Sequence, residues 1–263
     1  MPVTTAPVLV TGATGFLAAE IIKQLLEADY RVRGTTRDVA GSEADGQLAS
    51  LPGADQRLEM LEADLLDPGA FDAAVVGCEY VMHTASPFFI DVENPQHDLI
   101  DPAVEGTRSV LESVSKAGGV RRVVLTSSFA AMSGAPKEGM WNEDDWNNVS
   151  SLDSGPYAYS KTMAERAAWD FMDDDDRSFD LVVINPTGII GPSIVPRLNQ
   201  SHTLFVSATN GETPGIIDLH FPMVDVRDVA RAHIMAMENP EAAGRYLCSA
   251  ETRSMRQNFE LLK

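Results

Sequence analysis

The sequence predicts an α/β fold built on one open, mostly parallel sheet. Short apolar runs rich in β-branched residues alternate with helical patterns along the chain, and a glycine-rich turn joins the first run to the first helix. The chain has 263 residues, of which 44% are hydrophobic. This length suffices for one large domain with a sizeable core and a small appended lobe.

The first strand and its turn carry a nucleotide-binding pattern. Val8-Leu9-Val10 is followed at once by TGATGFLA at 11–18, and apolar residues then recur at helical spacing as far as Leu26. Strand, glycine turn and helix in this order are the context of a dinucleotide-binding loop. Gly12 and Gly15 let the backbone approach a pyrophosphate, and the helix N-terminus offers free N–H groups to that anion.

The second strand, 31–36, ends beside a basic residue. An acidic residue about 20 positions after the glycine turn would bind the ribose hydroxyls of NAD. Here the strand runs into Arg37, whose guanidinium suits the 2′-phosphate of NADP. Asp38 follows directly, and the alternative is an ordinary surface arginine.

Further strands and helices follow in alternation. We expect a polar loop with a short helix over 39–56, strands at 57–61, 79–86, 121–126, 179–185 and 246–248, and helices at 68–76, 102–116, 156–171 and 229–237. Asp101 is expected to cap the helix at 102–116 ahead of Pro102, and Gly118 to end it. Residues 192–221 are expected to be rich in loops, and Asp173–Asp176 to form a solvated loop where a helix ends.

Polar side chains gather where the predicted strands end, which is where open parallel sheets bind ligands. Thr84, Ala85 and Ser86 are small enough to lie against a cofactor, whereas His83 is expected to be a packed strand-end residue. Asp64 either contacts an adenine or caps the next turn. The hydroxyl of Ser128 either satisfies backbone groups or hydrogen-bonds a substrate oxygen.

A helix opening with PYAYSK at 156–161 follows a long loop that contains Trp141 and Trp146. Tyr157 and Lys161 are four residues apart and share a helix face. A phenol has a pKa of about 10, and a nearby ammonium lowers it. The pair could therefore exchange protons with a carbonyl substrate. The alternative is two surface residues on an amphipathic helix.

Composition excludes several classes of function. The formal charge is −19 and the isoelectric point is near 4.5, so nucleic acid and anionic membranes are not expected as partners. Cys78 and Cys248 have no metal-ligand spacing, and we expect no metal site and no disulfide scaffold. The N-terminus lacks a signal pattern and no apolar run reaches the ~18 residues of a membrane helix, so the expected compartment is the cytoplasm.

Taken together, these motifs resemble the extended short-chain dehydrogenases/reductases. Within that family the chain is most similar to the branch of plant dihydroflavonol and cinnamoyl-CoA reductases and of yeast and bacterial aldehyde and ketone reductases. The resemblance rests on TGATGFLA at 11–18, VRGTTRD at 32–38, HTASPF at 83–88, DPAVEGT at 101–107, RRVVLTSS at 121–128, YAYSK at 157–161, NPTGIIGP at 185–192 and VDVRDVARAH at 224–233.

The resemblance implies a Rossmann-type doubly wound parallel sheet with a small C-terminal substrate lobe. Residues 1–191, joined again by 223–249, would form the dinucleotide-binding domain, and 192–222 with 250–263 the lobe. It also implies an NADP-dependent carbonyl reductase or alcohol dehydrogenase, a ketoreductase or aldehyde reductase, with NAD as a possible cofactor. The expected partners are a small carbonyl substrate and, at most, a second copy of the chain.

Site residues follow from the matching motifs. The implied catalytic triad is Ser128, Tyr157 and Lys161. The implied cofactor-binding residues, which include Tyr157 and Lys161, are Gly12, Thr14, Gly15, Phe16 and Leu17 at the pyrophosphate, Arg37 at the 2′-phosphate, Asp64 and Leu65 at the adenine, Thr84, Ala85 and Ser86 at the ribose, and Ser127, Pro186, Thr187 and Ile189 at the nicotinamide.

The chain departs from the family pattern in two places. No lysine occurs at 39–47 to assist Arg37. Relatives continue for several dozen residues beyond the position of Lys263, so either the lobe is shortened or the sequence given omits part of it. Two alternatives stay open: an NAD-dependent sugar-nucleotide epimerase or dehydratase, and a non-catalytic NADP-binding regulatory protein. The side chains that could line an apolar substrate pocket or belong to the core are Phe88, Phe89, Met132, Trp141, Trp146, Phe205 and Phe221.

Overall fold

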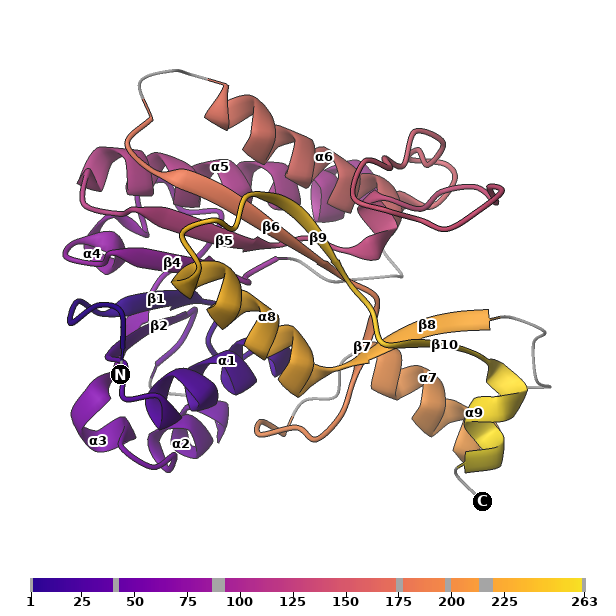
Figure 1. The fold of residues 1–263 in the computed structure, drawn as a ribbon, viewed down its shortest axis with the longest axis horizontal. Coiled ribbons are helices and arrows are strands. Elements are labelled where there is room, and N and C mark those ends of the chain that lie inside the picture. Colours follow the sequence, from indigo (N-terminus) through magenta and orange to yellow (C-terminus); the bar gives the residue numbers. More distant parts are fainter. Residues whose placement is uncertain are drawn as a thin grey trace.

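The computed structural model describes residues 2–39, 43–86, 93–173, 177–196, 200–212 and 220–261. A parallel sheet of seven strands forms its centre, in the order β3-β2-β1-β4-β5-β6-β9 (Figure 1). The strands are β1 (Val8–Thr11), β2 (Val32–Thr36), β3 (Leu58–Glu62), β4 (Tyr80–His83), β5 (Arg122–Thr126), β6 (Asp180–Pro186) and β9 (Gly244–Cys248). This architecture confirms the predicted doubly wound α/β fold.

Helices cover both faces of this sheet. Helices α1 (Phe16–Glu27) and α8 (Val226–Glu238) pack together on one face, and α4 (Asp72–Val75), α5 (Asp101–Ala117) and α6 (Pro156–Met172) lie on the other (Figure 1). In β1, Val8 and Val10 join the first core and Leu9 joins the second. Because successive side chains of a strand point to opposite faces, a strand buried on both sides reads as a continuous apolar run.

A second, smaller sheet lies beyond the carboxyl end of β6. Its strands are β7 (Gly188–Ile190), β8 (His220–Asp225) and β10 (Glu251–Ser254), in the order β10-β8-β7. Helices α7 (Gln200–Thr209) and α9 (Met255–Leu261) lie beside it (Figure 1). The small sheet includes 188–190, which the sequence analysis assigned to the first domain; the division of the chain at 191 and 223 stays a prediction.

Most predicted elements are present within a few residues of their expected bounds, and the loop at 39–56 contains α2 (Glu43–Ala49) and α3 (Ala54–Arg57). Gly118 ends α5 with a φ of 67°, as predicted. The prediction that Asp101 is an N-cap was wrong, because a π-helical turn, Gln96–Ile100, leads directly into α5. Residues 192–221 are less irregular than expected, since they contain α7 and the start of β8.

Helix α6 ends at Met172, ahead of the predicted acidic loop, whose members Asp174–Asp176 lie outside the described residues. None of the described helices combines the length and the apolar character that crossing a bilayer requires.

Arg122 joins the sheet to the end of α8. Its side chain is 6% exposed, and it pairs through two nitrogens with Asp180, at 2.6 and 2.8 Å. Its Nη1 also donates to the carbonyl oxygens of Ala236 and Asn239, each at 2.6 Å. The last carbonyls of a helix have no partner inside the helix, so Arg122 closes α8 against β5.

We expect Arg122→Ala to lower the free energy of unfolding by about 3 kcal/mol, because it leaves the carbonyl oxygens of Ala236 and Asn239 unpaired at the end of α8. Arg121→Ala is the matched control: Arg121 is 65% exposed and pairs with Glu79, so its loss should cost much less. Urea unfolding of both variants measures the difference. Equal losses would show that Arg122 does not support α8.

Candidate active site

The glycine turn after β1 packs against the loop after β4. Gly12 has a φ of +66°, and a Cβ placed on it would lie 3.0 Å from the Cβ of Ala85. Gly15 precedes α1 without a side-chain cap, and no acidic residue occupies the first turn of the helix. The first N–H groups of α1, those of Phe16 and Leu17 included, have no partner inside the helix and are free to bind an anion.

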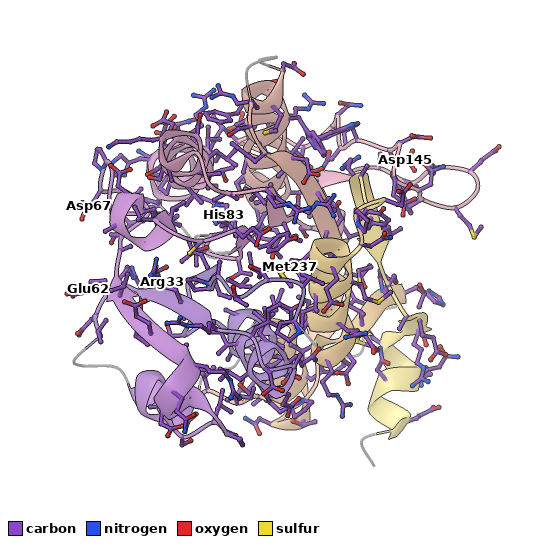
Figure 2. The ribbon with its side chains drawn as sticks, turned by 60° about the vertical axis from the view of Figure 1, so that its left-hand side comes forward. Arg33, Glu62, Asp67, His83, Asp145 and Met237 are labelled. Atoms are coloured by element: carbon purple, nitrogen blue, oxygen red, sulfur yellow. The ribbon has the colours of Figure 1, made fainter. Side chains whose placement is uncertain are left out.

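Thr11 holds the loop after β4 in place. Its Oγ1 accepts hydrogen bonds from the backbone N–H groups of Thr84 and Ala85, at 3.1 and 3.0 Å. It also bonds to Nδ1 of His83, at 2.9 Å. Burial lowers the pKa of His83 to about 3, so the ring is neutral. His83 lies in the interior (Figure 2), which confirms its prediction as a packed strand-end residue.

The three residues of the predicted triad come together from two neighbouring segments. Gly155 starts α6 with a φ of +78°, which places Tyr157 in the first turn of the helix and Lys161 one turn later. The Nζ of Lys161 lies 5.8 Å from the centre of the Tyr157 ring. Ser128 follows β5 and hydrogen-bonds Tyr157, while its Oγ accepts from the N–H of Ala130 at 3.1 Å.

Lys161 is also tied to the loop after β4. Its Nζ donates to Oγ of Ser86 at 2.8 Å, so the ammonium lies next to the segment that packs on the glycine turn. The carboxyl ends of β1, β4 and β5 thus meet the start of α6 at one edge of the sheet. A hydroxyl, a phenol and an ammonium at such an edge can bind an oxygen and exchange a proton with it.

Loss of hydration controls the acidity of this group. Burial raises the pKa of Tyr157 to about 12, and the hydrogen bond to Ser128 only partly opposes that rise. Burial lowers the pKa of Lys161 to about 8. The sequence predicted that Lys161 would lower the pKa of Tyr157; the pKa instead rises in this structure, because the loss of phenolate hydration outweighs the hydrogen bond to Ser128.

The predicted adenine end has a defined turn. Oδ1 of Asp64 accepts from the N–H of Leu66 at 2.9 Å, so Asp64 caps the turn after β3, one of its two predicted roles. Leu65 packs tightly on Gly106 of α5. A Cβ added to Gly106 would lie 3.1 Å from the Cβ of Leu65. Arg37, at the end of β2, is exposed to solvent.

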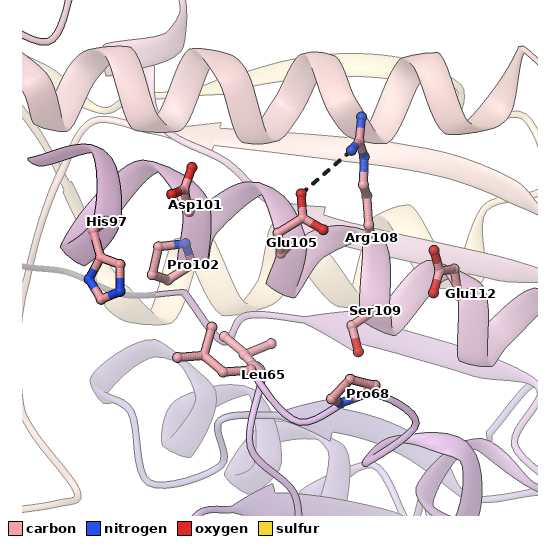
Figure 3. Close-up of a pocket in the computed structure, with 10 residues that line it drawn as sticks. Leu65, Pro68, His97, Asp101, Pro102, Glu105, Arg108, Ser109 and Glu112 are labelled. Carbon is pink, nitrogen blue, oxygen red and sulfur yellow. Dashed lines mark ion pairs between the residues drawn. The ribbon is translucent and has the colours of Figure 1, made fainter.

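A pocket of about 350 Å³ lies between this turn and α5 (Figure 3). Its lining includes Leu65, Asp101 and Ser109, together with Glu105 and Arg108, which pair at 3.5 Å. The triad does not contribute to its lining. This pocket is therefore separate from the edge that holds Ser128, Tyr157 and Lys161.

The predicted nicotinamide border lies at the junction of the two sheets. Pro186 is buried at the end of β6, and the N–H of Thr187 donates to the carbonyl of Cys248 at 3.0 Å. Ile189 pairs with Val224 in the small sheet. The cofactor contacts of these residues stay predictions.

The proposed apolar pocket residues have separate surroundings. Met132 is fully buried, and Trp141 packs edge-on against Phe129 with ring centres 5.9 Å apart. The ring of Trp146 lies 3.9 Å below the guanidinium of Arg245. Phe205 lies in α7 and Phe221 in β8, where Phe221 covers Gly188. Phe88 and Phe89 lie outside the described residues.

A buried polar group around Glu165, next to the triad, was not predicted from the sequence. The hydroxyl of Ser127 donates to Glu165, which also accepts from Asn185 and Arg245. One signal was visible, because Glu165 falls four residues after Lys161 and so lies on the helix face that carries the triad.

Comparison with known proteins gives concordant matches. Residues 8–248 match the model of the NAD dependent epimerase/dehydratase family. The chain is 43% identical over 248 residues to cinnamoyl-CoA reductase CAD2 of Medicago truncatula, covering 91% of this chain and 74% of the relative. It is 34% identical over 265 residues to dihydroflavonol 4-reductase of Gerbera hybrida, covering 98% and 72%. These matches support the prediction of an oxidoreductase.

Solved structures agree. Yeast methylglyoxal/isovaleraldehyde reductase Gre2 complexed with NADPH has a TM-score of 0.88 at 34% identity, covering 97% of this chain and 81% of that one. Vestitone reductase from alfalfa has a TM-score of 0.82 at 36% identity, covering 98% and 81%. The chain therefore belongs to the NAD dependent epimerase/dehydratase family, the extended short-chain dehydrogenases/reductases, as its motifs predicted.

Proposed function

We propose that this protein is an NADPH-dependent reductase that converts a ketone or an aldehyde to an alcohol. The observation that carries the proposal is the meeting of Ser128, Tyr157 and Lys161 beside the glycine turn. The reductase names of its relatives, and the NADPH complexed with yeast Gre2, support this reaction class and this cofactor.

The residues present fit a dinucleotide. The uncapped N-terminus of α1 and the close packing of Gly12 would hold the pyrophosphate, and the exposed Arg37 would meet a 2′-phosphate. The ammonium of Lys161, which donates only one of its three hydrogens to Ser86, would bind ribose hydroxyls. When bound, the nicotinamide supplies the hydride for the carbonyl carbon.

The protein's own groups handle the carbonyl oxygen. Ser128 accepts from Ala130 and hydrogen-bonds Tyr157, and in the complex its O–H would donate to that oxygen. As negative charge grows there, Tyr157 gives its proton. An alkoxide is a much stronger base than a phenolate of pKa about 12, so this transfer runs downhill. Lys161, held next to the phenol, stabilises the phenolate that results.

We expect Tyr157→Phe to lower kcat for a panel of aldehydes and ketones by about 100-fold or more, because it removes the proton donor. NADPH consumption followed at 340 nm measures the loss, and fluorescence titration should give a Kd for NADPH within a few-fold of the parent. Tyr159→Phe is the control, since a residue two positions along a helix faces away from the site.

Unchanged turnover in Tyr157→Phe would contradict the mechanism. A parent protein that released NAD on denaturation and turned over no carbonyl would favour the epimerase or dehydratase alternative.

Arg37→Ala tests the choice of cofactor. We expect KM for NADPH to rise about 10- to 100-fold and KM for NADH to change less than about twofold, because only NADPH carries the 2′-phosphate. Steady-state rates with both cofactors at one fixed substrate concentration give the comparison. Equal changes in KM for the two cofactors would show that Arg37 does not bind the 2′-phosphate.

The acidity of Lys161 predicts a pH profile. Lys161 is charged below its pKa of about 8 and neutral above it, whereas Tyr157 keeps its proton to about pH 12. We therefore expect kcat/KM for NADPH, which reports on the free enzyme, to fall about tenfold per pH unit above this pKa. Lys161→Met should be slow and lack that decline. A decline that persists in Lys161→Met would assign it to another group.

A further inference from the structure

Glu165 is a fully buried carboxylate one helical turn beyond Lys161. Its side chain is 0% exposed. Its oxygens accept from Ser127 Oγ at 2.5 Å, Asn185 Nδ2 at 2.7 Å, Arg245 Nε at 2.5 Å and Trp169 Nε1 at 3.4 Å. An ionised carboxylate offers about four lone-pair sites, so these donors saturate it.

Two of these donors lead directly to the predicted catalytic serine. Ser127 precedes Ser128, and its own N–H donates to the carbonyl of Ile184 at 2.8 Å. Asn185 shares its Nδ2 between Glu165 and the carbonyl oxygen of Ser128, at 2.7 and 3.2 Å. Glu165 therefore fixes the backbone on both sides of the Ser128 side chain.

The third donor connects Glu165 to the long loop before α6. Arg245, on β9, is 7% exposed at its side chain. Its Nη1 donates to the carbonyl oxygens of Glu143 and Asp145, at 2.8 and 2.6 Å, and its guanidinium stacks on Trp146. Asp145 lies in the projecting loop of Figure 2. One ion pair thus joins α6, β9 and residues 143–146.

Stability alone is a weak reason for this arrangement. Among the described residues, Asn185 Oδ1 and Arg245 Nη2 are buried without a hydrogen-bond partner. Unsatisfied buried polar atoms cost free energy, and well-packed apolar residues often replace buried ion pairs without loss of stability. A network that carries this cost next to the triad is better explained by what it positions.

We propose that Glu165, with Arg245 as its counter-ion, is a positioning residue that holds Ser128 in register with Tyr157. The inference rests on the proposed reductase function. Glu165 acts through Asn185 and Ser127 and touches neither substrate nor cofactor. The hydroxyl of Ser127 then serves this support, in place of the nicotinamide contact that the resemblance implied.

The test is a double-mutant cycle between Glu165→Gln and Ser128→Ala. Glutamine keeps the length but removes the charge and adds a donor where the carboxylate only accepts. We expect Glu165→Gln to lower kcat about tenfold or more in the parent, with KM for NADPH changed less than about threefold. In the Ser128→Ala background the same change should cost less than about twofold, because residues that act as a unit are not additive.

Asp180→Asn is the control, because it breaks the ion pair of Arg122, the other arginine with a buried side chain, far from the triad. It should lower the melting temperature and leave kcat unchanged. If Glu165→Gln does not fold, Arg245→Lys keeps the charge but loses the fork of nitrogens that reaches 143–146, and it should show the same non-additivity. Additive losses in the cycle would overturn the proposal.

Hydrogen exchange gives a readout that needs no turnover. Glu165→Gln should speed amide exchange at least about tenfold in 127–131 and 143–147 and leave α1 unchanged. If Tyr157→Phe shows the reductase function to be wrong, this exchange pattern still reports whether Glu165 holds the two segments. Unchanged exchange there, or uniform acceleration across the fold, would contradict the positioning role.

Discussion

The burial of Lys161 and the partial burial of Tyr157 at the carboxyl edge of the sheet are the constraint on which the rest of the site depends. Burial moves the pKa of Tyr157 up to about 12 and that of Lys161 down to about 8. In such surroundings each polar group must be satisfied by a protein neighbour or by a ligand. Ser128 hydrogen-bonds Tyr157, Ser86 accepts a hydrogen bond from Lys161, and Arg245 forms an ion pair with Glu165.

The fold forms this edge of the sheet where the strand order reverses. The strand order β3-β2-β1-β4-β5-β6-β9 changes direction between β1 and β4, where doubly wound sheets bind their ligands. Gly12 packs against Ala85 at this point, and α6 packs against the turn at 129–131 that follows β5. The glycine turn and the triad are thus two parts of one topological feature.

Local sequence patterns predicted the main strands and helices well, but they did not predict the small sheet or the ion pair behind the triad. Val8–Val10 and the Tyr157/Lys161 spacing are short-range signals, so the strand, the turn and the helix followed from them. Helix α7 reads QSHTLFVSAT, without a clear polar face, and β10 is only Glu-Thr-Arg-Ser at the edge of a small sheet. The Glu165–Arg245 pair joins residues 80 positions apart, and no local pattern predicts it. The direction of the Tyr157 pKa depended on burial, which spacing does not reveal.

The burial of Lys161 costs free energy in the ligand-free site, and the same burial favours ligand binding. Ser86 takes one of the three hydrogens of Lys161, and the ammonium has lost most of its hydration. In the proposed reductase, ribose hydroxyls would complete this coordination, so part of the free energy lost in burying Lys161 returns as cofactor affinity. Ligand binding would then stabilise the folded protein by more than its contacts at the glycine turn alone provide.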